Sequence, residues 1–128
     1  MQLNFFTRAD IKFAELQPYN YILKDLDDFL DLLGNADYHY ADCIIVRESN
    51  LNQEFFDLKT GFAGEVLQKF STYNHRLAIV GDFSKYKSNS LQAFIRESNR
   101  QGRILFTEKS ESAVEILCNS GIIEKNNN

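Results

Sequence analysis

Cysteine is scarce in this sequence, and its spacing excludes several kinds of chemistry. The two cysteines among the 128 residues, Cys43 and Cys118, show no Cys-x-x-Cys spacing, and neither of the two histidines is placed to suggest a partner. Both cysteines stand in apolar surroundings. We therefore expect buried, reduced thiols rather than a disulfide or a catalytic nucleophile.

Long apolar runs and an excess of basic residues are also missing. No stretch approaches the roughly 20 apolar residues that span a bilayer, and the N-terminus lacks a basic segment followed by an apolar run. The formal net charge of -4 is spread along the chain, unlike the basic footprint of a nucleic-acid binder. We expect a cytoplasmic protein that binds neither a membrane nor nucleic acid.

Proline and glycine are few, with one and six residues, which disfavours a disordered or fibrous chain. The composition that remains is typical of a globular protein, with 44% hydrophobic and 25% charged residues. A chain of this length can bury roughly two thirds of the surface that it exposes when unfolded. We predict a single α/β domain over residues 1–123 and a polar C-terminal tail over residues 124–128.

Strand and helix patterns alternate along the chain. Short runs at 2–6 and 11–16 predict a β-hairpin, and apolar runs at 42–47, 76–81 and 103–107 predict three further strands, the first of them central. Helices are predicted after Pro18 with a stop at Gly34, from Phe62 to Phe70, over 88–101, and from Ser110 to near Gly121. Ile122 and Ile123 would form a short tail strand or plug.

This order, β-β-α-β-α-β-α-β-α, predicts a mixed, mostly parallel five-stranded sheet with about four helices in two or three layers. The first helix carries four aspartates, Asp25, Asp27, Asp28 and Asp31. They could suggest a metal site, but negative charge is favoured in a first helical turn and helical geometry points these side chains apart. We expect a solvated acidic face, and neither a metal nor a cofactor.

The entrance to the helix at Phe62 is the most unusual stretch. Asp57 or Thr60 could cap the helix, and the N–H groups left uncovered at Gly61 could, with Lys59, hold an anion such as a phosphate or a partner's carboxylate. Gly64 costs up to about 1 kcal/mol inside a helix, which suggests a close backbone approach by a strand or a partner. The alternative is a capped helix packed tightly on its sheet.

A second polar loop, beginning at Asp82, follows the next strand. Loops after parallel strands share the carboxyl edge of a sheet, so we expect the two segments to form one partner-binding or anion-binding surface. Its aromatic residues would be either interface anchors or part of the core. The candidate residues are Phe55, Phe56, Asp57, Lys59, Thr60, Gly61, Asp82, Phe83, Ser84 and Lys85.

The runs Glu54 to Phe70, Leu77 to Phe83 and Phe94 to Asn99 resemble the uncharacterised bacterial family catalogued as domain of unknown function 4180. The resemblance covers nearly the whole chain, but the family has no established activity. It therefore implies a fold family and leaves the function open.

A more distant resemblance is to the STAS domain of anti-sigma-factor antagonists, which has the same element order. Its Asp-Ser-[Ser/Thr]-Gly turn is phosphorylated on the first serine. Aligned on Gly61, this chain keeps a hydroxyl at Thr60 but has Lys59 where the phosphorylated serine would stand. The resemblance implies a non-catalytic regulatory or protein-interaction domain acting through Asp57 to Gly61.

Two other functions fit the sequence. A small enzyme or ligand-binding protein could use Asp57, Thr60 and Asp82 at the same edge, with a divalent cation between the carboxylates. A homodimer could form through an exposed sheet edge or through the aromatic loops. His39 and His75 are expected to be loop histidines rather than catalysts.

Overall fold

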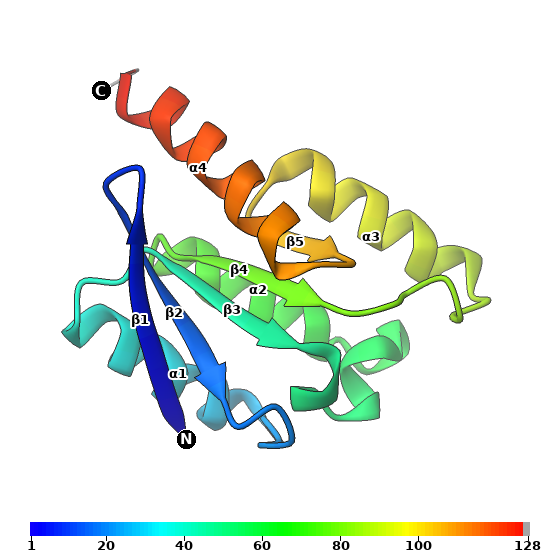
Figure 1. Ribbon diagram of the computed structural model, residues 1–128. Helices are drawn as coiled ribbons and strands as arrows, with labels where there is room; N and C mark the ends of the chain where they lie inside the picture. Colours follow the sequence, from blue (N-terminus) through cyan, green and yellow to red (C-terminus); the bar gives the residue numbers. More distant parts are fainter. Residues whose placement is uncertain (127–128) are drawn as a thin grey trace.

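The strands of the sheet lie side by side in the order in which they occur in the sequence. The computed structural model describes the backbone of residues 1–126 and the side chains of residues 1–119 (Figure 1). The strands are β1 (Gln2–Arg8), β2 (Ile11–Gln17), β3 (Cys43–Arg47), β4 (Arg76–Val80) and β5 (Ile104–Thr107). β1 and β2 pair antiparallel and all other neighbours pair parallel. The predicted mixed, mostly parallel five-stranded sheet with β3 at its centre is confirmed.

Four helices cover the sheet and make three layers (Figure 1). They are α1 (Leu26–Tyr38), α2 (Phe62–Thr72), α3 (Asn89–Gln101) and α4 (Ser110–Asn126). The first three share one apolar core with one face of the sheet, whereas α4 packs on the other face. Each parallel connection steps to the next strand in the same direction. Because such crossovers are right-handed, α1, α2 and α3 must lie on the same face.

The central strand is buried on both faces, as its unbroken apolar run predicts. Ile44 and Val46 of β3 belong to the core beneath α1, α2 and α3, while Cys43 and Ile45 belong to the core beneath α4. All four residues are at most 2% exposed. Because β3 is packed on both sides, it fixes the position of the loop that begins at Glu48, at the carboxyl edge of the sheet.

The N-terminal hairpin turns through only two residues, Ala9 and Asp10, so both strands are longer than predicted. Both turn residues have positive φ angles, 53° and 64°, as in a type I′ turn. Arg8 and Ile11 are the first pair of the ladder, and the register continues without a bulge to Gln2 and Gln17.

Two predicted helix ends are wrong. α1 continues through Gly34 to Tyr38, and α4 continues through Gly121 to Asn126, which replaces the predicted tail strand at Ile122 and Ile123. A glycine costs about 1 kcal/mol inside a helix and ends it only where the chain turns left-handed. Burial of Ala36, beyond Gly34, favours continuation of α1. Of the predicted tail, residues 124–126 are helical and residues 127–128 lie outside the described part of the chain.

Three short 3-10 helices connect β3 to α2: Glu48–Asn50, Gln53–Phe56 and Leu58–Thr60. Asn50 joins the first of them to the loop after β2. Its side-chain oxygen accepts the N–H of Arg47 at 2.8 Å, and its amide nitrogen donates to the carbonyls of Pro18 and Tyr21 at 3.2 and 2.7 Å. Asn50 is fully buried and, together with the exposed Ser49, whose hydroxyl donates to the Tyr19 carbonyl, ties the end of β3 to the loop after β2.

Candidate functional site

The two predicted loops do meet at the carboxyl edge, and aromatic rings join them. The ring of Phe56 lies 4.8 Å from that of Tyr86, nearly parallel to it, and 6.1 Å from that of Phe83. Phe83 in turn packs edge-on against Phe106 of β5 at 5.2 Å. The segment before α2 and the loop after β4 are therefore one packed unit.

Of the two alternatives predicted for the aromatic residues here, interface anchor or core, Phe55 and Phe56 follow the second. Phe55 is 1% exposed and Phe56 8%, and both belong to the core beneath α1, α2 and α3. Phe55 packs against Phe29 and Phe62. Phe83 is half-buried against the same core. These rings support the surface from below because burying aromatic area stabilises the loops far more than exposing it would.

The helix entrance is exposed and held by its own hydrogen bonds. The Asp57 carboxylate accepts the Lys59 N–H at 3.2 Å, so it caps the 3-10 turn rather than α2. The Thr60 hydroxyl lies 2.9 Å from the Asp57 carbonyl oxygen and accepts the Phe62 N–H at 3.2 Å, as predicted for a cap of α2. Gly61 follows with a φ of +77°, a conformation that side chains disfavour. Asp57, Lys59, Thr60 and Gly61 are all exposed.

The close backbone approach expected at Gly64 occurs at Gly81 instead. A Cβ atom added at Gly64 would meet nothing within 4 Å. One added at Gly81 would stand 2.7 Å from Cβ of Glu48 and 3.3 Å from the Phe83 ring. The absence of a side chain at Gly81 therefore allows Glu48, directly after β3, to pack against the backbone that follows β4.

The loop after β4 is also internally bonded. The Asp82 carboxylate accepts from the backbone N–H and the hydroxyl of Ser84, at 3.1 and 2.6 Å. These hydrogen bonds lower the pKa of Asp82. The Lys85 ammonium pairs with Glu48 at 2.7 Å, and Gln92 of α3 donates to the carbonyls of Phe83 and Tyr86 at 2.8 and 2.9 Å. The side chains of Asp82, Ser84 and Lys85 therefore all take part in holding the loop.

Glu48 is the residue that the sequence analysis missed. Its carboxylate accepts from the Tyr86 hydroxyl at 2.5 Å besides pairing with Lys85. Burial, and then Glu48, raise the pKa of Tyr86. Beside it, Arg47 pairs with Glu15 at 2.8 Å and lies over the ring of Tyr19. Glu48 directly follows β3, whose last residue is Arg47. Its place at the carboxyl edge was therefore visible in the sequence, whereas its contacts with Tyr86 and Lys85 were not.

The site residues hold no arrangement typical of a metal centre. Asp57 and Asp82 each accept hydrogen bonds from their own turns. Among the described residues, no group of three or more His, Cys, Asp or Glu gathers as a metal would need. The sequential strand order also has no point at which crossovers change direction, and such a point is where a binding crevice opens in an open parallel sheet.

The histidines lie away from this edge. His39 ends α1 and its ring packs on Phe5 at 4.6 Å. His75, directly before β4, is 6% exposed, and its Nε2 lies 3.4 Å from the Asp37 carboxylate. The first is a loop histidine as predicted, and the second lies in the turn before its strand but is buried.

Both cysteines are free and buried, as predicted. Burial raises the pKa of the Cys43 thiol to about 12. Because the thiolate is the reactive form, we expect the folded protein to react negligibly with a disulfide reagent at pH 8, and to release two equivalents of thiol in denaturant. Rapid reaction of the folded protein would contradict this assignment.

Taken together, these features define a three-layer α/β protein with an exposed, internally hydrogen-bonded polar surface at the carboxyl edge of a mixed sheet. The chain belongs to the family described as domain of unknown function (DUF4180), which matches residues 8–117. No curated protein and no solved structure matches it. Within the described residues no helix combines the length and the apolar character that crossing a membrane requires.

Proposed function

We propose that the protein is a non-catalytic, regulatory protein-interaction domain that binds its partner through the helix entrance Asp57 to Gly61 and the adjoining loop from Asp82 to Lys85. The observation that carries this proposal is that an exposed polar surface is held in place by its own hydrogen bonds. The entrance is hydrogen-bonded within itself and rests on the buried rings of Phe55 and Phe56.

These internal hydrogen bonds favour partner binding because they lower the entropic cost of ordering the surface in the complex. Fixing a flexible side chain or loop on binding costs about 0.5 to 1.5 kcal/mol for each immobilised side chain. Here the backbone from Asp57 to Phe62 is already fixed by three side-chain hydrogen bonds. Lys59 is exposed and makes no ion pair with any described residue, so it is available to a partner's carboxylate.

Such a domain would bind a partner through the same turn as the STAS domain, but phosphorylation of that turn would not control the binding. The Thr60 hydroxyl donates to the Asp57 carbonyl and accepts the first N–H of α2, so phosphorylating it would remove the proton that it donates and break the bond to Asp57. Lys59 has no hydroxyl to phosphorylate. We therefore propose recognition without phosphorylation of the entrance.

The enzymatic alternative receives no support from the geometry. It needs the carboxylates of Asp57 and Asp82 to converge on a cation. Asp57 instead accepts from Lys59 and Asp82 accepts from Ser84, each within its own turn. Three pockets lined by described residues, of about 280, 220 and 400 Å³, include none of the ten residues proposed for this surface.

The test begins with capture of partners from a bacterial lysate, followed by affinity measurement with each purified partner. We expect Lys59→Glu to weaken binding by about tenfold or more, since placing like charges together across an interface is costly. Lys69→Glu is the matched control, because it makes the same charge change at the opposite end of α2. Equal affinities for the wild type and Lys59→Glu would overturn the proposed surface.

A further inference from the structure

The outer edge of β1 is long and unprotected. β1 is seven residues long, and Arg8 at its end is the only charged residue in it. It contains no proline or bulge, and within the described residues no strand pairs with its outer side (Figure 1). Natural sheets protect free edges with short strands, charges, prolines or bulges. The opposite edge follows this rule, since β5 has four residues and packs against α3 and α4.

The hairpin register shows which backbone groups are free. In a two-residue hairpin, the residues that flank the turn exchange both hydrogen bonds, and every second pair after them does the same. Counting from Arg8 and Ile11, the even-numbered residues of β1 bond to β2. Leu3, Phe5 and Thr7 therefore direct their N–H and C=O groups outward, away from the sheet.

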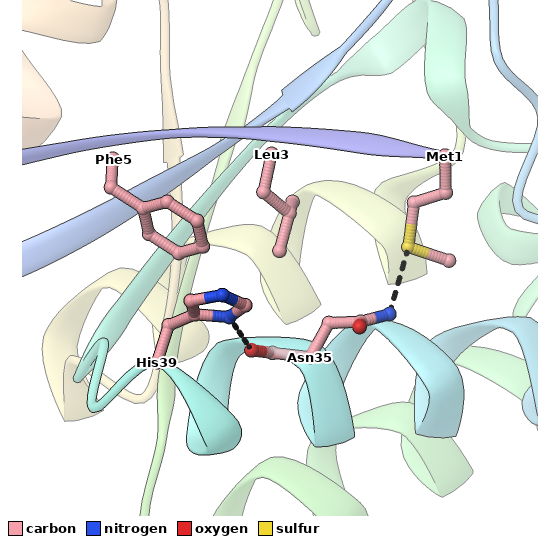
Figure 2. Close-up of a pocket in the computed structure, with 5 residues that line it drawn as sticks. All are labelled: Met1, Leu3, Phe5, Asn35 and His39. Carbon is pink, nitrogen blue, oxygen red and sulfur yellow. Dashed lines mark hydrogen bonds between the residues drawn. The ribbon is translucent and has the colours of Figure 1, made fainter.

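A groove of about 280 Å³ runs beside this edge, between β1 and α1. Figure 2 shows Leu3 and Phe5 of β1, and Met1 directly before it, extending toward Asn35 of α1 and His39 directly after the helix. The Asn35 amide lies 3.8 Å from the Met1 sulfur, and His39 donates through Nδ1 to the Asn35 carbonyl at 2.9 Å. The side chains of the outward-bonding residues Leu3 and Phe5 thus form one wall of the groove.

We propose that a second copy of this chain docks on this edge, β1 against β1 in antiparallel orientation, to form a two-fold dimer with a continuous ten-stranded sheet. The three outward residues form a self-complementary set centred on Phe5. Phe5 would pair with the second copy's Phe5, and Leu3 with the second copy's Thr7. This surface uses other residues than the carboxyl-edge site and does not depend on its function.

The charges along the groove favour a second copy of this chain, in the antiparallel orientation, as the partner of β1. The Met1 end lies beside Asn35, one turn after the exposed Asp31, and α1 contains no lysine or arginine. The Phe5 end lies beside His39, whose carbonyl accepts from Lys12 at 2.7 Å. Lys12 is paired with Thr7 in the hairpin, and Thr7 of the second copy would pair with Leu3. The two-fold axis therefore brings the second copy's Lys12 toward the Met1 end of the groove, where Asp31 lies.

The test is the mass of the full chain in solution, by light scattering or sedimentation. We expect the wild type to show twice the 14.8 kDa chain mass. Thr7→Pro should give a folded monomer, because proline removes only an outward N–H and is tolerated on an edge strand. Thr7→Val, which keeps that N–H, should remain dimeric.

A second variant covers the case in which Thr7→Pro fails to fold. Thr7 is exposed, so Thr7→Lys should fold normally while placing a charge on the paired edge, whereas Thr72→Lys on α2 should leave the dimer intact. A monomeric wild type, or a dimer that survives Thr7→Lys, would overturn the proposal.

The register has its own test. Hydrogen-bonded antiparallel pairs have Cα atoms about 5.5 Å apart, within the range of a disulfide. Phe5→Cys should therefore form a disulfide between chains on mild oxidation, and Leu3→Cys should not, because two copies of Leu3 would stand far from each other. Equal cross-linking of both variants would exclude pairing centred on Phe5.

Discussion

Replacing Asn50 with leucine is expected to lower the free energy of unfolding by about 3 to 5 kcal/mol, the largest effect that we predict for one residue. The side chain is fully buried and makes three hydrogen bonds to backbone groups. Leucine has a similar volume but leaves the Arg47 N–H and the Tyr21 carbonyl without the bonds that Asn50 gives them. The Pro18 carbonyl loses one of its two hydrogen bonds and keeps the one from the Tyr21 N–H at 3.0 Å. Urea denaturation followed by circular dichroism measures the loss.

The matched experiment is Asn50→Asp, which keeps the shape of the side chain and the acceptor for Arg47. It replaces a donor by a carboxylate facing the Pro18 and Tyr21 carbonyls, so we expect a destabilisation at neutral pH at least as large. Asn20→Asp makes the same change at an exposed position nearby and should alter stability by less than about 0.5 kcal/mol. Similar losses in both aspartate variants would show that Asn50 does not join the two loops.

The second large effect is expected from a methyl group at Gly81. Gly81→Ala places Cβ 2.7 Å from Cβ of Glu48, an atom that cannot move without its backbone. Overpacking of this kind costs about 1 to 3 kcal/mol. It also displaces the carboxylate that holds Lys85 and Tyr86. We expect a lower thermal midpoint and a more exposed Tyr86, visible by absorbance in the folded state.

Gly64→Ala is the control for this prediction, with the opposite sign. Gly64 lies inside α2, and an added Cβ meets nothing within 4 Å. Alanine should therefore stabilise the protein by about 0.5 to 1 kcal/mol through its higher helix propensity. A destabilised Gly64→Ala would mean that a close neighbour lies at Gly64 after all, and a neutral Gly81→Ala would mean that Glu48 can move.

A repeated tetrapeptide shows how far local sequence decides structure. Arg-Glu-Ser-Asn occurs at 47–50 and again at 96–99. The first copy ends β3 and forms a 3-10 turn, and the second lies within α3. The flanking apolar residues distinguish them, since 43–46 are continuously apolar whereas Leu91 and Ile95 have helical spacing. The element type is therefore set by the neighbouring pattern, which the sequence contains.

The hydrogen-bond partners of the asparagine in each tetrapeptide are set by tertiary contacts. Asn50 is fully buried and binds the loop after β2. Asn99 exchanges hydrogen bonds with the backbone of Phe106 in β5, at 2.7 and 3.3 Å. Pro18 and Tyr21 are far from Asn50 in the sequence, and Phe106, although only seven residues from Asn99, lies on a different element. The periodicity of one element could therefore not identify either partner. The contacts of Glu48 with Tyr86 and Lys85 were hidden for the same reason.

The sequence by itself determined the number, order and type of the main elements and the mixed, mostly parallel sheet, because hydrophobic periodicity is a local property of the chain. It also placed the two candidate loops at one edge, since that follows from parallel strands. Only the tertiary structure decided that Phe55 and Phe56 are core, that α1 continues past Gly34, and that the close approach lies at Gly81 rather than Gly64. Each depends on which distant atoms occupy the neighbouring space, and packing at close range is a property of the whole fold.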